Sequence, residues 1–314
     1  MNWLLEPFHH EFMRRALLGC ALIGFTNGYL SAFIVLRRLA LMADALSHSL
    51  LPGLAVGVLV FGFTPVSVFA GGLVAAMLVA LGSEIISRSS RIKEETALAV
   101  LYTLAFSVGI VLLSFAHVQV ELEHYLFGNI LGLSNSDLWI TYFISLTILP
   151  TLVALQRPLL VMLFEPSVAR SQGVNVVALN YLLVTFLVLA MISSLQAVGV
   201  ILALGLLVAP AATVYLFSDS CPALFWGGGI VGATGSCLGL LISYWLNIPA
   251  GACIVMLLGL MFFAAYICSP RYGVFRHLFM RRHLHEESLS RWRAQAGQTA
   301  HAHEPARPRA GEDE

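Results

Sequence analysis

Long apolar segments separated by short polar connections run along most of this chain. Each segment approaches the ~20 residues that a helix needs to cross the hydrocarbon core of a bilayer. Several connections carry turn-forming residues, such as Thr64-Pro65 and Asn247 shortly before Pro249. The pattern predicts an all-α, polytopic membrane protein whose transmembrane helices, about nine in number, lie near 16–36, 43–62, 65–86, 96–116, 138–156, 176–195, 198–217, 223–246 and 251–268.

The two ends of the chain differ from this apolar core. Residues 1–15 predict an extracytoplasmic or interfacial segment, in which Glu6 and His9 come too early for the apolar core of a signal peptide. Residues 16–268 form the predicted transmembrane domain. Residues 269–314 are polar, basic and histidine-bearing, which predicts a largely disordered tail.

Composition supports a membrane protein. Hydrophobic residues make up 59% of the chain and charged residues 11%, whereas a soluble domain carries roughly 25% charged residues. The mean hydropathy is +0.86. The five cysteines are dispersed in apolar surroundings with no paired spacing, so neither a disulfide framework nor a thiolate metal site is expected.

The distribution of basic residues predicts the orientation in the membrane. Lys and Arg follow the first, third, fifth and ninth spans and are absent from the connections after the second, fourth, sixth and eighth, although Arg14 and Arg15 precede the first span. Because basic connections stay in the cytoplasm, the N-terminus is predicted outside and the C-terminus inside. The basic residues on the predicted cytoplasmic side are Arg37, Arg38, Arg88, Arg91, Lys93, Arg157, Arg170, Arg271, Arg276, Arg281 and Arg282.

The chain has a single lysine, Lys93, and no glycine-rich loop precedes it. A phosphate-binding P-loop needs such a loop ending in Gly-Lys-Ser/Thr. If transport is driven by ATP, the nucleotide site therefore belongs to a partner chain. No feature of the sequence suggests a nucleic-acid partner.

Asp44 and His48 are the most informative polar residues inside the predicted spans. At a spacing of four they share one face of a helix, and an ionised Asp inside a bilayer costs roughly 2.5–3.5 kcal/mol on insertion scales. A carboxylate and an imidazole suit Zn²⁺, Mn²⁺ or Fe²⁺, and a two-fold pair of chains would offer four such ligands. The alternative is that Asp44 caps its helix and His48 bonds a neighbouring span.

Three other sets of residues are candidates with simpler alternatives. Glu121, Glu123 and His124 predict an acidic outer vestibule that attracts divalent cations, or else an ordinary solvated loop. For the histidines of the tail, the two interpretations are transient metal binding and a flexible tail without a metal role. Glu84 is expected to pair with Arg88, four residues later, as a structural contact.

Several motifs resemble the ABC permease family that imports manganese, zinc and iron. The most specific is the element Asp-Ala-Leu-Ser-His followed by Leu-Pro-Gly, within residues 44–53, and Ala43 departs from it because the family usually has glycine there. Further similarities lie in order over about residues 6–265, at 6–17, 35–53, 125–131, 164–174 and 197–213.

This resemblance implies a permease domain over residues 16–268 in a bacterial inner membrane, with the helical fold of cobalamin and siderophore importers. It implies a second permease copy or a paralogue, two cytoplasmic P-loop ATPases and an extracytoplasmic metal-binding protein. Zn²⁺, Mn²⁺ or Fe²⁺ would be cargo, bound on its way by Asp44 and His48 of both protomers, and no prosthetic group is expected. The implied ATPase contacts are Pro210, Ala211, Ala212, Thr213 and Asp219, with Glu165, Arg170 and Gly173 as a second candidate.

Three alternatives stay open from the residues. The first is an importer permease for a chelated metal or a cobalamin-like ligand. The second is an ion-gradient-driven carrier, which would need more charged residues inside the spans. The third is a membrane-embedded metalloprotease, for which the sequence lacks a His-Glu-x-x-His motif.

Overall fold

The computed structural model describes residues 6–37, 39–62, 64–116 and 130–269, and every regular element within these ranges is a helix. The helices are α1 (Glu6–His9), α2 (Glu11–Arg37), α3 (Ala40–Phe61), α4 (Pro65–Ser89), α5 (Glu94–Ala116), the 3-10 turn η2 (Ile130–Gly132), α7 (Asn135–Ala154), α8 (Gln156–Phe164), α9 (Pro166–Ser171), α10 (Val176–Val198), α11 (Val200–Tyr215), α12 (Cys221–Leu246) and α13 (Ala250–Cys268).

The all-α, polytopic fold predicted from the sequence is confirmed. Among the described residues, eight helices are long and apolar enough to cross a membrane. The predicted span at 198–217 is the shorter helix α11, whose 16 residues rise only about 24 Å at ~1.5 Å per residue. Helix α2 begins at Glu11, earlier than the predicted start at 16.

Local sequence signals set several helix boundaries. Thr64 and Ser67 form a capping box at the start of α4, and Ser134 and Asp137 form one at the start of α7. Each box satisfies backbone N–H groups that would otherwise lack acceptors. Gly199 has a φ of 84° and separates α10 from α11, because glycine adopts a positive φ without the clash of a Cβ atom.

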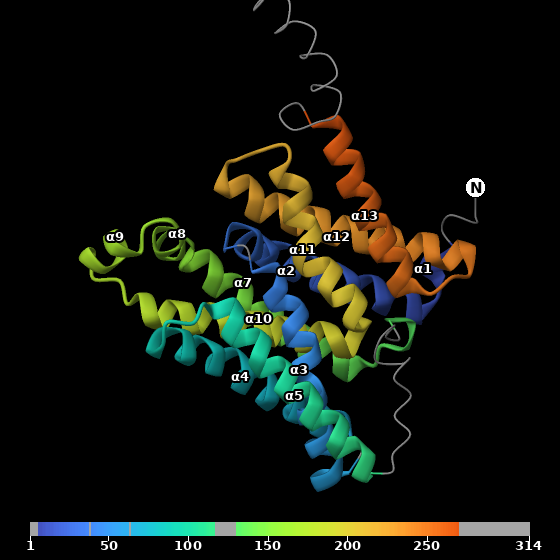
Figure 1. Ribbon diagram of the computed structural model, residues 1–314. Helices are drawn as coiled ribbons and strands as arrows, with labels where there is room; N and C mark the ends of the chain where they lie inside the picture. Colours follow the sequence, from blue (N-terminus) through green and yellow to red (C-terminus); the bar gives the residue numbers. More distant parts are fainter. Residues whose placement is uncertain (1–5, 38, 63, 117–129, 270–314) are drawn as a thin grey trace, which may run out of the picture.

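The helices form two connected groups. Figure 1 shows α3, α4 and α5 together in the lower part of the view and α11, α12 and α13 in the upper part, with the long helix α2 and helices α7 and α10 between them. Helix α2 packs most extensively on α12 and also on α11 and α7, and α3 packs on α4 and α5. The shorter helices α8 and α9 extend away from both groups.

Glycines allow the closest helix contacts. A Cβ added at Gly28 of α2 would lie 2.2 Å from the carbonyl oxygen of Gly228 of α12, and one added at Gly53 of α3 would lie 2.0 Å from the carbonyl oxygen of Gly71 of α4. Small residues are common where membrane helices pack backbone against backbone. These contacts fix α2 against α12 and α3 against α4.

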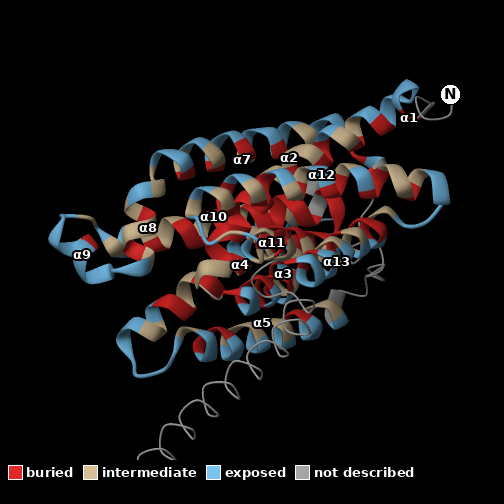
Figure 2. Ribbon diagram, turned by 90° about the horizontal axis from the view of Figure 1, so that it is seen from above, coloured by how far each residue is buried: buried red, intermediate tan, exposed pale blue. Residues whose placement is uncertain are grey.

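Buried residues gather in the middle of the bundle, around α10 and α11, and α5 is largely exposed (Figure 2). Both views place α9 and the turn between α4 and α5 at one end of the bundle, here named the α9 end. Helix α1 and the turn between α12 and α13 lie at the opposite end, named the α1 end.

Candidate functional site

Asp44 and His48 lie one turn apart on α3, as their spacing predicts. Asp44 Oδ1 is 3.9 Å from His48 Nε2, and the two side chains are 56% and 47% exposed in the single chain. In a helix of strongly apolar sequence, such exposure leaves both groups able to bind something outside the chain. The pair thus offers one carboxylate and one imidazole on an accessible surface.

The alternative role of Asp44 as a helix cap is wrong. Helix α3 has Leu39 at its N-cap position, where no side chain bonds the free N–H groups, and Asp44 is already inside the helix. The Asp44 carbonyl accepts a 2.6 Å hydrogen bond from Ser47 Oγ. Capping therefore does not explain why an acidic residue stands here.

Two aromatic rings of α5 hold the imidazole of His48. Its ring centroid lies 6.1 Å from that of Tyr102, nearly parallel, and 5.5 Å from that of Phe106, edge to face. Sequence reasoning missed this contact, although the four-residue spacing of Tyr102 and Phe106 places both rings on one face of α5. The rings restrict the orientation of the imidazole and leave its exposed edge available.

Pro52 continues the same face of α3, one turn beyond His48. Proline has no backbone N–H, so the His48 carbonyl lacks its usual helical donor. Helix α5 approaches at this point, because a Cβ added at Gly109 would lie 2.7 Å from the Pro52 nitrogen. The break in helical hydrogen bonding at His48 thus lies where α5 packs closely against α3.

The single chain does not complete a metal site within its described part. No group of three or more His, Cys, Asp or Glu side chains close enough to hold an ion occurs among the residues that the structure describes. Transition-metal ions such as Zn²⁺ take four or more ligands. The remaining ligands would have to come from water or from another chain.

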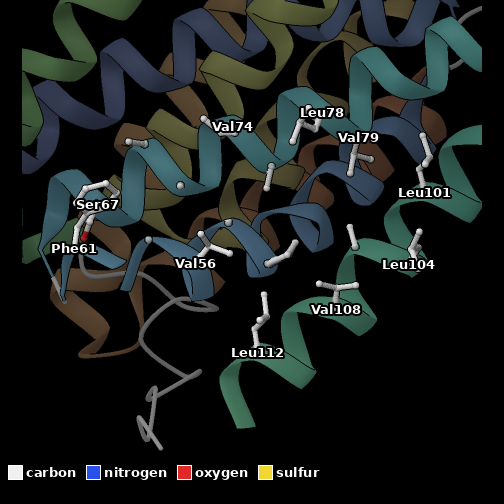
Figure 3. Close-up of a pocket in the computed structure, with 17 residues that line it drawn as sticks. Val56, Phe61, Ser67, Val74, Leu78, Val79, Leu101, Leu104, Val108 and Leu112 are labelled. Atoms are coloured by element: carbon white, nitrogen blue, oxygen red, sulfur yellow. The ribbon is translucent and has the colours of Figure 1, made fainter. Parts of the chain in front are cut away.

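An apolar groove begins at Pro52 and runs between α3, α4 and α5 (Figure 3). Its volume is about 600 Å³, and among the described residues that line it Ser67 alone has a polar side chain. Its composition gives no ligand for a cation. The labelled lining residues are Val56, Phe61, Ser67, Val74, Leu78, Val79, Leu101, Leu104, Val108 and Leu112.

The vestibule candidates Glu121, Glu123 and His124 lie outside the described residues. The same holds for the histidines of the tail beyond residue 269. For these groups the sequence-based hypothesis stays as it was.

The two candidate ATPase-contact segments differ in exposure. Pro210 to Thr213 lie inside α11, and Ala211 is fully buried, with its N–H donating to Ser31 Oγ at 3.0 Å. Asp219 lies in the connection between α11 and α12. The second candidate segment is at the surface, where Glu165, Arg170 and Gly173 are exposed on and around α9.

The expected pair of Glu84 and Arg88 is confirmed, since Arg88 Nε donates to Glu84 Oε1 within α4. The structure adds two residues that sequence reasoning missed. Arg37 at the end of α2 and Glu94 at the start of α5 interact electrostatically with this pair. The sequence carried a signal for this grouping, because all four residues lie at ends of predicted spans on the predicted cytoplasmic side.

Comparisons with known proteins cover nearly the whole described chain. A family model described as the ABC 3 transport family matches residues 9–269. The manganese transport system membrane protein MntC of Listeria monocytogenes is 34% identical over 274 residues, which cover 87% of this chain and 96% of the relative.

Two further similarities agree with these. A Haemophilus influenzae protein named as a probable iron transport system membrane protein is 34% identical over 268 residues, covering 85% of this chain and 97% of the relative. A solved chain of PsaBC from Streptococcus pneumoniae, in complex with a Fab, superposes with a TM-score of 0.76 at 32% identity. That match covers 89% of this chain and 99% of the other.

Proposed function

This chain belongs to the ABC 3 transport family, and we propose that it is the membrane-spanning permease subunit of an ATP-driven importer of divalent transition-metal ions. Family membership confirms the resemblance inferred from the sequence motifs. It also favours ATP-driven transport over the gradient-driven carrier, and transport over intramembrane proteolysis. The observation that carries the metal assignment is the half-exposed Asp44–His48 pair on α3.

Two permease chains would complete the ion site. One chain offers two ligands, and a two-fold axis beside α3 would bring a second carboxylate and imidazole to the same ion. Oxygen and imidazole ligands without thiolate suit Mn²⁺, Fe²⁺ and Zn²⁺, and the relatives are named for manganese and iron. The ion is cargo, so the site must release it and its affinity should be modest.

The α9 end of the bundle is assigned to the cytoplasm of a bacterial plasma membrane. The turn between α4 and α5 carries Arg91 and Lys93 at this end, and α9 carries Arg170. Positively charged connections favour the cytoplasmic side. The α1 end, with the N-terminus, would then face outward and receive the ion from an extracytoplasmic metal-binding protein.

Of the two candidate segments for contact with a cytoplasmic ATPase, helix α9 is the one that exposure supports better. It projects from the bundle at the α9 end (Figures 1 and 2), and Glu165 and Arg170 point charged groups to its surface. In the other candidate segment, Ala211 is buried inside α11. The connection near Asp219 is therefore the part of that segment that is accessible to a partner chain. Two ATPase subunits, one for each permease chain, would supply ATP hydrolysis.

Uptake of radioactive Mn²⁺ and Zn²⁺ by cells tests the ion site. Asp44→Ala and His48→Ala should each lower uptake at limiting metal by about tenfold or more, as loss of a metal ligand or its immediate support typically does. Matched controls are Glu95→Ala and His9→Ala, since both residues are exposed and lie outside the site. Wild-type uptake by well-expressed Asp44 and His48 variants would remove the site from the pathway.

A further inference from the structure

Four charged side chains gather where α2 ends, α4 ends and α5 begins. This inner charge cluster consists of Arg37, Glu84, Arg88 and Glu94, and Glu84 is only 4% exposed. Glu84 and Arg88 form an ion pair in which the Arg88 side chain is still 34% exposed, and Arg37 and Glu94 interact with this pair electrostatically. A buried carboxylate such as Glu84 is stable only where opposite charge compensates it.

Within the cluster, Arg88 joins α4 to α10. Its Nε donates to Glu84 Oε1 one turn earlier, and its guanidinium lies 5.5 Å from the centroid of the Tyr181 ring. Cations over aromatic rings are attracted by the negative face of the ring. A shift of α10 would therefore act directly on Arg88 and Glu84.

Helix α10 is in turn tied to α9. The Ala169 carbonyl accepts a 3.0 Å hydrogen bond from the Val174 N–H across Gly173, whose φ is 78°. Asn175 then caps α10 by accepting a 3.0 Å bond from the Ala178 N–H. With Ala169 fully buried, these bonds leave little freedom between the two helices.

Arg37 connects the cluster to the ion site. It is the last residue of α2, and α3 begins at Ala40. The joint is tight, since the Leu39 N–H donates to the Ile34 carbonyl at 2.9 Å. Asp44 lies four residues into α3, about 6 Å along the helix at ~1.5 Å per residue. A displacement of Arg37 would therefore move the start of the helix that carries Asp44.

Arg37 is incompletely paired in this conformation. Among the residues that the structure describes, no hydrogen-bond partner reaches its buried Nη1, and none reaches the buried Oδ1 of Asn180, which is next to Tyr181 on α10. A buried donor without an acceptor is unfavourable and calls for an explanation. Here a donor on α2 and an acceptor on α10 are both unsatisfied.

Both groups belong to the same region of the bundle. Arg88 interacts electrostatically with Arg37, and its guanidinium lies over the ring of Tyr181, the residue that follows Asn180. Helix α10 also contacts α2, where Asn27 Nδ2 donates to Ser194 Oγ at 2.6 Å. A relative movement of α2 and α10 would therefore change which groups face Arg37.

We propose that the inner charge cluster is a positioning element that couples movement of α9 to the ion site, with Arg37 exchanging its acidic partners for Asn180 between the two access states. The proposal rests on the proposed function, since it requires an ATPase to move α9. Neither Arg37 nor Asn180 contacts the ion. Their effect is to couple the movement of α3 to that of α9, and the Asp44–His48 pairs keep their geometry within each access state.

The test uses the complete transporter, with its ATPase partner, reconstituted in proteoliposomes. Three quantities are measured: Mn²⁺ bound at equilibrium, ATP hydrolysed and Mn²⁺ transported. Arg37→Gln and Asn180→Leu should each lower Mn²⁺ transported per ATP by about tenfold, within the usual range of coupling between distant sites. Binding and hydrolysis should stay within about twofold of wild type, because neither residue touches ion or nucleotide.

Three variants make the result specific. Arg37→Lys keeps the charge and should recover part of the coupling, whereas Arg91→Gln removes an exposed charge from the nearby turn and should change nothing. Glu94→Gln replaces Arg37→Gln if the latter does not reach the membrane as a monodisperse complex, and should show the same uncoupling.

Transport and hydrolysis that fall in parallel, or transport per ATP that stays at the wild-type value in Arg37→Gln and Glu94→Gln, would overturn the coupling role. Failure of the wild-type complex to move Mn²⁺ with ATP would instead count against the proposed function. The two failures are therefore separable in one set of vesicles.

Discussion

Helices α2 and α12 pack backbone against backbone, whereas α3 carries its two ionisable residues on a half-exposed face. Along α2, Gly24 and Gly28 bring the backbone against glycines of α12, and the rings of Tyr29 and Phe33 pack on Phe225 beside them. On α3, Asp44 and His48 bring polar groups into a segment of apolar sequence. The α2–α12 contact is complete within one chain. The Asp44–His48 pair leaves a carboxylate and an imidazole available to bind an ion together with a second chain.

This difference shows how stability and function are divided in the molecule. Membrane helices gain little from hydrophobic burial against each other, because lipid is equally apolar, so close packing of small residues supplies the attraction. Intramembrane acids are costly and persist where they have a partner or a cavity. We therefore expect changes at α2–α12 to affect folding and changes at α3 to affect transport.

The largest effect is expected at Gly28. Gly28→Leu would force a side chain into the Gly228 carbonyl, which is backbone and has no room to move aside, and should destabilise the fold by about 3 kcal/mol or more. Gly259→Leu on α13 is the matched control, since no atom of the described residues lies within 4 Å of a Cβ at that position. The measurement is the monodisperse fraction in detergent on heating, and equal melting of the two variants would contradict the account.

A smaller effect is expected from the buried hydrogen bond between Asn27 and Ser194. A double-mutant cycle with Asn27→Ala and Ser194→Ala should give a coupling of about 0.6–1.7 kcal/mol, the range found for polar contacts between membrane helices. Thr234→Ala on the exposed side of α12 should cost less, because its hydroxyl donates to carbonyls of its own helix, those of Ile230 and Val231. Additive effects at Asn27 and Ser194 would argue against the contact.

The rings beside His48 should affect affinity more than folding. Phe106→Leu frees the imidazole and should weaken Mn²⁺ binding by about two- to tenfold, since such ring pairs contribute roughly 0.5–1.5 kcal/mol. Phe143→Leu, on the exposed side of α7, is the control. Calorimetric titration of the purified permease with Mn²⁺ measures both, and unchanged binding in Phe106→Leu would show that the ring does not position His48.

Much of the fold could be predicted from the sequence, because apolar segments of membrane length leave few alternatives. The spacing of Asp44 and His48 and their shared face were also predictable from helical geometry alone. The span predicted at 198–217 also lies close to the bounds of α11, Val200–Tyr215. What the apolar pattern did not give is the positive φ of Gly199 by which the chain breaks between α10 and α11.

Contacts between distant segments escaped sequence reasoning. The approach of Tyr102 and Phe106 to His48, and of Glu94 to Arg37, depends on how α5 lies against α3 and α2, which no local pattern specifies. The burial of Ala211 likewise depends on Ser31 of α2, 180 residues away in the sequence. Periodicity gives the exposed face of a helix, and packing decides which neighbour covers the rest.

The metal content of purified permease tests the central claim most directly. In equilibrium dialysis against saturating Mn²⁺, elemental analysis should find one bound ion for every two chains in wild type and in Glu95→Ala, and almost none in Asp44→Ala. One ion for each chain, or full occupancy in a folded Asp44→Ala variant, would contradict a shared site built from Asp44 and His48 of two chains.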